Sequence, residues 1–406
     1  MSKRKTTAGG TGITSYTIKC EKSIIGSPEM RVNQADHIVN WGRKNDYPFR
    51  LIDLYVNSVT HHSCIDFAVN AIAGNGVDLE AMRMRSEDLQ APNYHTSWDQ
   101  FIRAIAFDFV LYGGFAFQVI KNKDGKTYSF FNQPFETVRF EQMDEDGVIP
   151  ACWISADWTA KQKFPPQRIP LFGFQEDEEI PAGQVYMFVY ISPNPVSPYY
   201  PIPTYIGGLK SIQAECEYLK FDLKSILNGF VASGAISCPP MASDEEKQAM
   251  VDNIQRMLTG SENANSIMVT FREDSNDDPV RFTPFSMSND AVDLYDAAND
   301  RCVNRIIAAH KISSRGLIGL PMDDSGFSDS GNLLETALQV YNVNVANANR
   351  TVILSVLNNA FRLNGIDTEV VLKPLSYVSV TSAEATVGEP VNDDEVTERE
   401  GGAASV

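Results

Sequence analysis

Two segments of the chain repeat apolar side chains at alternating spacings of three and four residues, which is the pattern of a helix with one apolar stripe along its length. Turn-forming residues bound the first segment, so we expect one long helix over 208–232 and a second over 288–312. The stripes are Leu209, Ile212, Cys216, Leu219, Leu223, Ile226 and Phe230 in the first helix, and Val292, Tyr295, Asn299, Cys302, Ile306 and Ala309 in the second. This arrangement predicts a separate small unit, residues 233–287, between the two long helices.

Residues 233–287, between the two helices, have the pattern of a small α/β unit. Ser243 and Glu246 have the spacing of a capping box, which predicts the start of a helix. Three strands are expected around this helix, at 235–236, 267–271 and 280–282. The last two strands are predicted to pair with each other as a hairpin.

Residues 41–207 combine helices with strands. Helices are expected to begin at the cap candidate Asp46, near Thr60 and at Ser97, and the third helix is expected to end at Gly113. After Gly113 the apolar period changes to two, which indicates strands. These strands are expected at 115–120 and 127–131 as one hairpin, at 138–140 and 148–149 as another, and at 169–172 and 185–190. Helices followed by antiparallel strands predict an α+β fold class.

The two ends of the chain are polar. We expect residues 1–40 to form a flexible arm, with folded structure beginning near Trp41, and residues 378–406 to form an acidic disordered tail. Between the second striped helix and the tail, the pattern predicts a flexible polar loop at 313–331, then a long helix over 332–361. A strand at 370–372 is expected to close the fold.

Composition narrows the function classes. The chain has 406 residues with 34 Lys and Arg against 52 Asp and Glu, a formal net charge of -18, which disfavours a surface that grips phosphate backbones. The six cysteines are spread without a Cys-x-x-Cys pair, so they indicate neither a zinc site nor a disulfide framework. The sequence has no apolar run long enough for a membrane span and no apolar signal core at its N-terminus, so we expect a soluble protein of a reducing compartment.

No credible catalytic constellation is found. The sequence lacks a P-loop, and the adjacent His61 and His62 point about 100° apart on a helix, so they cannot bind one metal from the same face. The acidic pairs Asp277-Asp278 and Asp323-Asp324 lie in polar loops without a nearby histidine, where solvated turns are the simpler interpretation. A hydrolase using these pairs remains one alternative, and loss of hydrolysis in Asp323→Ala would favour it.

Seven short motifs occur in a specific order and spacing over about 41–377. They are Asn45-Asp46-Tyr47-Pro48 with Leu51-Ile52-Asp53-Leu54-Tyr55, Tyr112-Gly113-Gly114-Phe115-Ala116-Phe117-Gln118, Tyr200-Pro201-Ile202-Pro203-Thr204-Tyr205-Ile206-Gly207-Gly208-Leu209, Asn228-Gly229-Phe230, Gly260-Ser261-Glu262-Asn263-Ala264, His310-Lys311-Ile312-Ser313-Ser314 and Gly331-Asn332-Leu333-Leu334-Glu335. In this order they resemble the portal proteins of tailed bacteriophages, especially a compact branch from phages of Bacteroidetes-type hosts.

The resemblance implies a structural protein without catalytic activity or cofactor. It implies a homo-oligomeric ring, usually of twelve copies, at one capsid vertex, through which a separate terminase ATPase pumps double-stranded DNA during packaging and through which DNA leaves on ejection. The expected partners are the large terminase, a head–tail adaptor, the major capsid protein and scaffold, and the passing DNA, which is contacted non-specifically. Assembly in the host bacterial cytoplasm and final localisation in the virion are implied as well.

The resemblance also divides the chain into the family's parts. These would be the wing at 41–207, the stem at 208–232 and 288–312, the clip at 233–287, the tunnel loop at 313–331, and the long wing helix with its closing strand at 332–377. Little sequence follows residue 377, so any crown would be minimal.

Candidate functional residues follow from these parts. The candidates are Lys210, Lys220, Lys224, Asp293 and Asp300 in the stem and channel; Leu320, Met322, Asp323, Asp324, Ser325, Gly326, Phe327 and Ser328 in the tunnel loop; and Asp244, Glu245, Glu246, Asp277 and Asp278 at the terminase or adaptor contact of the clip. For the lysines, an ordinary solvent-exposed helix face is the competing interpretation. A second alternative function is another ring component of the virion, such as a head–tail adaptor.

Overall fold

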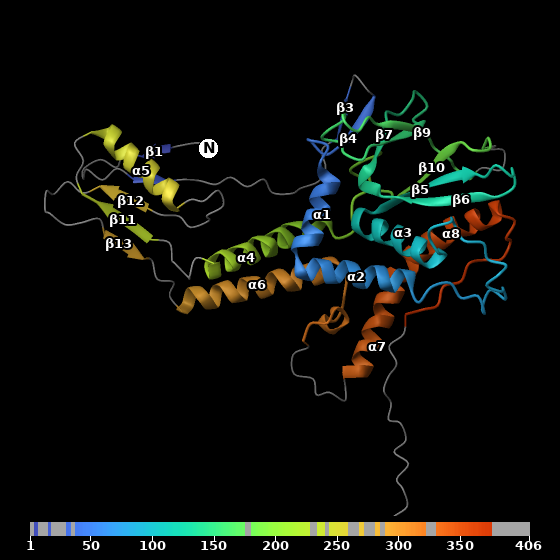
Figure 1. Ribbon diagram of the computed structural model, residues 1–406. Coiled ribbons are helices and arrows are strands. Elements are labelled where there is room, and N and C mark those ends of the chain that lie inside the picture. The colour runs from blue at the N-terminus through green and yellow to red at the C-terminus, as the bar shows by residue number, and fades with distance from the viewer. Residues whose placement is uncertain are drawn as a thin grey trace, which may run out of the picture.

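A computed structural model describes residues 4–6, 15–17, 30–33, 37–174, 180–227, 234–239, 243–258, 268–271, 281–284, 289–321 and 330–375. The architecture is α+β, as the sequence predicted. A body of helices and antiparallel sheets carries two long helices that project to one side, and a small α/β module lies at their far end (Figure 1).

Two antiparallel sheets form the strand part of the body. One has the order β10 (Val185–Ile191), β5 (Gly114–Lys121) and β6 (Tyr128–Gln133). The other has the order β3 (Met30–Asn33), β4 (Ile38–Trp41), β7 (Val138–Glu141), β8 (Ala151–Ile154) and β9 (Gln167–Pro170). Because β3 and β4 belong to this sheet, the ordered body extends ahead of the start expected near Trp41. A separate short pair joins β1 (Arg4–Thr6) to β2 (Ser15–Thr17).

Side-chain capping explains where two of the first three helices of the body begin. α1 spans Tyr47–Asn57, and Asp46 occupies its N-cap position without a capping side-chain bond. α2 spans Val59–Ala73, one residue ahead of the predicted start, because the Ser58 hydroxyl accepts the N–H of His61. α3 spans Trp98–Tyr112, with the predicted cap at Ser97 as part of a capping box and with Gly113 in the left-handed region at φ 86°.

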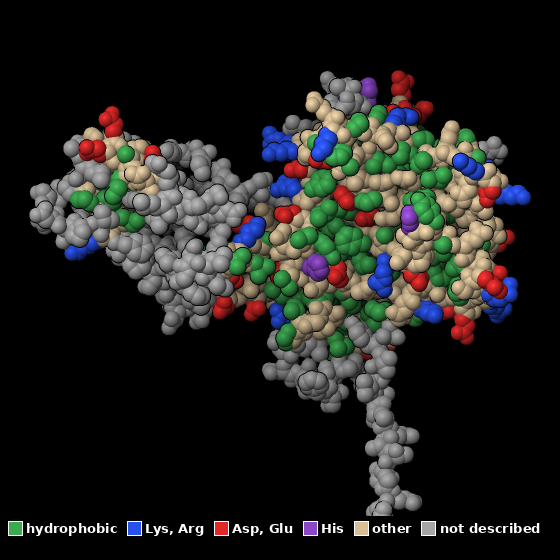
Figure 2. All heavy atoms as spheres, viewed as in Figure 1, with side chains coloured by type: hydrophobic (Ala, Val, Ile, Leu, Met, Phe, Trp, Pro, Cys, Tyr) green, Lys and Arg blue, Asp and Glu red, His purple; other side chains and the backbone are tan. Residues whose placement is uncertain are grey.

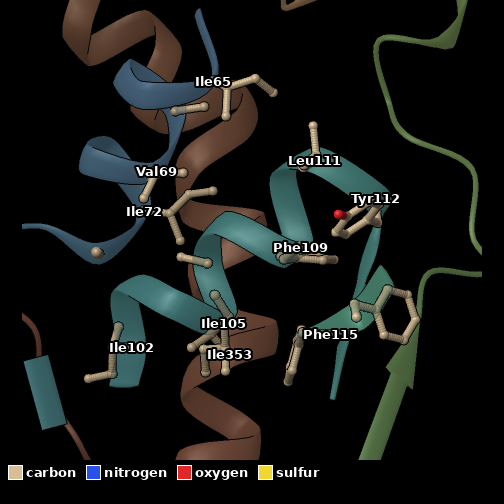
Figure 3. Close-up of a cluster of buried hydrophobic side chains, with 14 of the residues drawn as sticks. Ile65, Val69, Ile72, Ile102, Ile105, Phe109, Leu111, Tyr112, Phe115 and Ile353 are labelled. Atoms are coloured by element: carbon tan, nitrogen blue, oxygen red, sulfur yellow. The ribbon is translucent and has the colours of Figure 1, made fainter. Parts of the chain in front are cut away.

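The main core lies between these helices and the first sheet. In Figure 3, Ile72 of α2 points toward α3, where Ile105 lies beside Ile353 of α8 (Asn347–Leu363), and Ile65 lies farther along α2; all four side chains are buried. Aromatic side chains of β5 and β6 extend the same cluster. The apolar periodicity of the body helices therefore marks the faces that pack together.

One predicted hairpin is confirmed and the next is shifted. β5 pairs with β6 antiparallel, from Ala116 opposite Gln133 to Lys121 opposite Tyr128. By contrast, β7 pairs with a strand that starts at Ala151, so the expected strand at 148–149 is wrong. Val148 instead closes a tight turn, in which its N–H donates to the Asp144 carboxylate, and its side chain is exposed.

The two striped helices are antiparallel neighbours. α4 spans Leu209–Leu227 and follows a 3-10 turn, η2 (Ile206–Gly208), while α6 spans Asn289–Ala309. They run side by side away from the body (Figure 1).

The module between them contains β11 (Gly234–Cys238), α5 (Asp244–Leu258), β12 (Met268–Phe271) and β13 (Arg281–Pro284). The strand order is β12, β11, β13, so the predicted hairpin of the last two strands is wrong. α5 connects β11 to β12 as a parallel crossover, and β13 then pairs antiparallel with the other edge of β11. The buried side chains of Ile236, Cys238, Val269 and Phe271 form a small core separate from the main one.

The C-terminal helical segment is interrupted. Instead of one helix over 332–361, α7 (Ser330–Tyr341) is joined to α8 by a π-helical segment at Asn342–Ala346. The loop expected at 313–331 contains a 3-10 turn, η3 (Arg315–Ile318), whose Leu317 is buried. At 370–372 there is an isolated bridge from Leu372 to Val77 in place of a strand.

The remaining expectations concern the chain ends and the membrane. Residues 378–406 and most of the arm at 1–40 lie outside the described residues. Among the helices that the structure describes, none combines the length and apolar character needed to cross a bilayer.

Candidate functional site

The candidate site is the α4–α6 pair together with its junction to the body. At the body end the two helices approach so closely that a Cβ added to Gly208 would lie 2.6 Å from the Cβ of Ala309. Further along, Ile212 and Cys216 of α4 and Cys302 and Ile306 of α6 are buried. Glycine at 208 is therefore required by the close approach of the two chains.

Farther from the body, a tyrosine contact holds the pair. The Tyr295 ring of α6 packs edge-on against the Tyr218 ring of α4, with centroids 5.1 Å apart. The Tyr295 hydroxyl donates to the Asp222 carboxylate at 2.6 Å. Burial and this bond raise the pKa of Tyr295. The hydroxyl therefore stays protonated at neutral pH and keeps donating.

The apolar stripe of α4 changes character along the helix. Leu209 and Ile212 are 1% and 0% exposed, whereas Leu219 and Leu223 are 40% and 57% exposed. Near the body, the stripe of α4 is thus part of the buried core. Farther along the helix, the same stripe is an exposed apolar surface. Surface of this kind is available for contact with another molecule.

A buried carboxylate ties α4 to the start of α2. The Glu215 carboxylate accepts the hydroxyls of Ser58 and Thr60, the latter at 2.6 Å, and also the Thr60 N–H at 3.3 Å. Because Ser58 caps α2, the carboxylate lies at the positive end of that helix dipole. Glu215 therefore fixes the position of α4 relative to the body.

Two histidines and a tyrosine form the other half of the junction. Nδ1 of His61 on α2 lies 2.9 Å from Nε2 of His310, which follows the last residue of α6. The Tyr205 ring, just before α4, stacks on His310 with centroids 4.8 Å apart and contacts His61 edge-on. The Tyr205 hydroxyl donates to the Leu111 carbonyl of α3 at 2.7 Å. Burial lowers the pKa of both imidazoles, that of His310 to about 3.

The predicted stem residues are distributed over several small contacts. Lys210 is exposed in the first turn of α4, and the Lys220 ammonium lies 3.6 Å from the Glu217 carboxylate. Asp300 of α6 is exposed and lies 3.9 Å from the Arg315 guanidinium of η3. The side chains of Lys224 and Asp293 lie outside the described part of the structure.

The predicted clip and tunnel-loop residues are described only in part. Asp244, Glu245 and Glu246 form the exposed first turn of α5, where the Glu246 N–H donates to the Ser243 hydroxyl at 3.2 Å. Leu320 follows η3 and is half-buried. The other candidates lie outside the described residues: Asp277, Asp278, Met322, Asp323, Asp324, Ser325, Gly326, Phe327 and Ser328.

The described residues contain no group of three or more His, Cys, Asp or Glu side chains arranged to hold a metal ion. Their cysteines, Cys64, Cys152, Cys216, Cys238 and Cys302, are all buried. Burial raises the pKa of the Cys64 and Cys152 thiols to about 12, so they lack thiolate character at neutral pH.

Sequence reasoning missed the junction residues. The sequence places His61 and His310 far apart, with no shared motif, so it contained no sign that their rings would meet. Glu215 interrupts the apolar pattern of the first striped helix, next to Cys216, and a buried acid of this kind needs partners. Ser58, whose residue type is favoured at helix N-caps, stands just before α2, and this signal could have located the partners of Glu215.

Comparisons with known proteins find no family for this chain and only distant structural similarity. No protein-family model matches the chain, and no curated protein matches it. The solved structures similar to it include the virion of a native gene transfer agent (GTA) particle, with a TM-score of 0.49 and 12% identity over 86% of each chain. Two others are the neck of an empty GTA particle computed with C6 symmetry (TM-score 0.49, 12% identity, 82% of this chain and 85% of the other) and the neck of a native GTA particle computed with C12 symmetry (TM-score 0.47, 14% identity, 86% of each chain). Similarity at this level does not establish a family.

Proposed function

We propose that this protein is a portal protein, the subunit of a ring at one capsid vertex of a tailed phage or phage-like particle. The ring would be a channel for double-stranded DNA during packaging and ejection and the docking site for the large terminase and a head–tail adaptor. The chain would assemble with capsid and scaffold proteins in the bacterial cytoplasm and remain in the virion. We propose no catalytic activity for it.

The observation that carries the proposal is the insertion of a small α/β module between two antiparallel helices that project from an α+β body (Figure 1). This order of parts is what the sequence resemblance implied for wing, stem and clip. The 19 residues of α4 and the 21 of α6 give rods of about 28 and 31 Å at 1.5 Å per residue. Rods of this length can form a segment of a channel wall.

The uncovered half of the α4 stripe supports a ring. Leu219 and Leu223 are exposed in the single chain although they continue the buried stripe of Ile212 and Cys216. A neighbouring copy in a closed ring would present a complementary surface to the same region of every subunit. The contact would remove these leucines from water.

The charge distribution fits a conduit better than a DNA clamp. The net charge of -18 disfavours tight binding of phosphates, and transport through a channel requires weak contact. Figure 2 shows Lys, Arg, Asp and Glu interspersed over the described face of the body, with no large area of one sign. Non-specific passage of DNA needs no base-reading surface.

The decisive experiment is the mass and shape of the purified full-length protein. Negative-stain microscopy and mass photometry are expected to show turbine-shaped rings, about 540 kDa for twelve chains of 45.0 kDa each. The double variant Leu219→Glu with Leu223→Glu is expected to stay folded and to lose the ring. Val148→Glu is the matched control, because Val148 is equally exposed but lies on a turn of the body. A wild-type protein that stays a 45.0 kDa monomer at tens of micromolar would refute the proposal.

A head–tail adaptor is the alternative within the same class of ring proteins. An adaptor acts after packaging, so particles made without it would contain DNA. Particles made without a portal would stay empty. DNA content of heads produced in cells lacking this chain therefore separates the two functions.

A further inference from the structure

The buried pair of His61 and His310 has a feature that a purely structural contact would not need. Two neutral imidazoles 2.9 Å apart can share a single hydrogen bond, in which one ring donates and the other accepts. Nε2 of His61 is buried and has no hydrogen-bond partner among the described atoms. Both rings are enclosed, with His61 0% and His310 6% exposed. The pair holds together only while at least one ring nitrogen at the contact lacks a proton.

We propose that the His61–His310 pair is an acid-sensitive latch between the paired helices and the body, and that its protonation releases the α6 end from α2. The geometry places the latch at a junction of separate elements: α2 supplies His61, the end of α6 supplies His310, and Tyr205, just before α4, covers both rings. Releasing the latch would loosen the attachment of both long helices to the body. This inference does not depend on the proposed function.

Among the described residues, no carboxylate raises the pKa of either imidazole. Glu215 of α4 is already bonded to Ser58 and Thr60. Burial lowers the pKa of His310, and Arg315, which follows it in the chain, lies 3.9 Å from the Asp300 carboxylate. On α2, His62 lies at the surface, and its imidazole is 3.3 Å from Asp66.

The other titratable groups around the junction are neutral at the relevant pH. Burial raises the pKa of each of them: Tyr47 on α1, Cys64 on α2, Tyr112 on α3, Tyr205 before α4, Cys302 on α6 and Tyr341 on α7. Between pH 7.5 and 5.0 none of these groups changes its charge. The imidazoles of the latch are then the groups whose protonation differs between the closed and the open junction.

The direction of the pH effect follows from the lowered pKa of both rings. A buried base that resists protonation contributes full stability above its free pKa of about 6.5 and loses it as pH falls toward the folded value, about 3 for His310. At pH 5.0, 1.5 units below the free value, opening should be favoured about 30-fold for each imidazole that it frees. Two imidazoles give about 1,000-fold.

Hydrogen exchange of the full-length protein tests the latch. Peptides covering 58–66 and 300–312 are compared at pH 7.5 and 5.0, after correction for intrinsic exchange and with 114–121 in β5 as the internal reference. From pH 7.5 to 5.0, we expect the opening equilibrium constant of the wild type to rise by about 1,000-fold relative to the reference. In His310→Gln only the His61 imidazole is left to be released, so the expected rise is about 30-fold. His62→Gln, a surface histidine of the same helix, should respond like wild type.

A second measurement needs no variant. Exchange of the imidazole C2–H, followed by mass spectrometry on wild-type protein, reports the titration of each histidine. His61 and His310 are expected to titrate well below the free value of about 6.5 and to exchange slowly. A wild-type response under threefold, a response abolished by His62→Gln, or a His61 and His310 that titrate freely near 6.5 would each overturn the latch.

Discussion

The Tyr295 hydroxyl of α6 donates a hydrogen bond to the Asp222 carboxylate of α4, and the two oxygens lie 2.6 Å apart. This bond crosses the helix pair well away from the body. Removing it therefore tests how much the contact between the two helices contributes to stability independently of the main core.

Tyr295→Phe removes this bond and keeps the ring. We expect a loss of about 1 kcal/mol in the free energy of unfolding, the usual contribution of one such bond, measured by chemical denaturation. Tyr218→Phe is the matched control, since it keeps the ring that packs on Tyr295, and should change the free energy by less than about 0.5 kcal/mol. Equal effects of the two variants would show that the Asp222 contact contributes nothing specific.

Gly208→Ala tests the close approach at the body end of the pair. The new Cβ would meet the Cβ of Ala309 at 2.6 Å, so the helices must separate, at an expected cost of about 1–3 kcal/mol in unfolding free energy. Gly207→Ala is an adjacent control, because a Cβ there meets nothing within 4 Å. Thermal denaturation should distinguish the two; a harmless Gly208→Ala would mean that the helices are not held at this distance.

Glu215→Ala should destabilise the protein more than an ordinary surface change. It leaves the Ser58 and Thr60 hydroxyls and the Thr60 N–H without their buried acceptor, so we expect a loss of about 3 kcal/mol, measured by urea denaturation. Glu217→Ala, two residues along the same helix, removes a partly exposed ion pair with Lys220 and should cost about 0.5 kcal/mol. Similar costs would contradict the role assigned to Glu215.

Asp108→Asn should stabilise the protein at neutral pH. Asp108 of α3 is buried, its Oδ2 has no partner among the described atoms, and burial together with Glu136 raises its pKa well above 3.8. An acid of this kind loses stability as pH rises from 3.8 toward the folded pKa, by about 1.4 kcal/mol per unit. The melting temperature of the variant should therefore exceed that of wild type at pH 7 and approach it at pH 4.

Asp124→Asn should change the melting temperature in the opposite direction, lowering it at pH 7. Bonds from the Thr127 hydroxyl and from backbone N–H groups lower the pKa of the exposed Asp124 to about 2. Its ionised form stabilises the β5–β6 turn, so the variant should melt lower than wild type at pH 7. A melting temperature of Asp124→Asn equal to or above that of wild type at pH 7 would contradict this prediction.

Much of the helical structure could be predicted because its causes are local. Ser97 and Gly113 bound α3 as expected, and the three-four spacing located the α4–α6 pair, with the start at Leu209. Capping chemistry and apolar period depend on neighbours along the chain, so the sequence shows them directly. The predicted β5–β6 hairpin was confirmed for the same reason, since its turn is short.

Structural features that depend on contacts between distant segments were not predicted. The sequence gives no sign of which edge of β11 receives β13, and the expected hairpin in the module was wrong. The π-helical segment at Asn342–Ala346 has no local breaker such as proline. The meeting of His61 and His310 joins residues far apart in sequence. The tunnel-loop and clip assignments remain predictions.

The small core of Ile236, Cys238, Val269 and Phe271 shares no buried residue with the main cluster. The chain enters and leaves this unit through the adjacent far ends of α4 and α6 (Figure 1). Evolution or protein engineering could therefore replace the whole module with another domain through two splice points, without changing the body. Sequence changes confined to this module would therefore leave the buried residues of the main cluster unaltered.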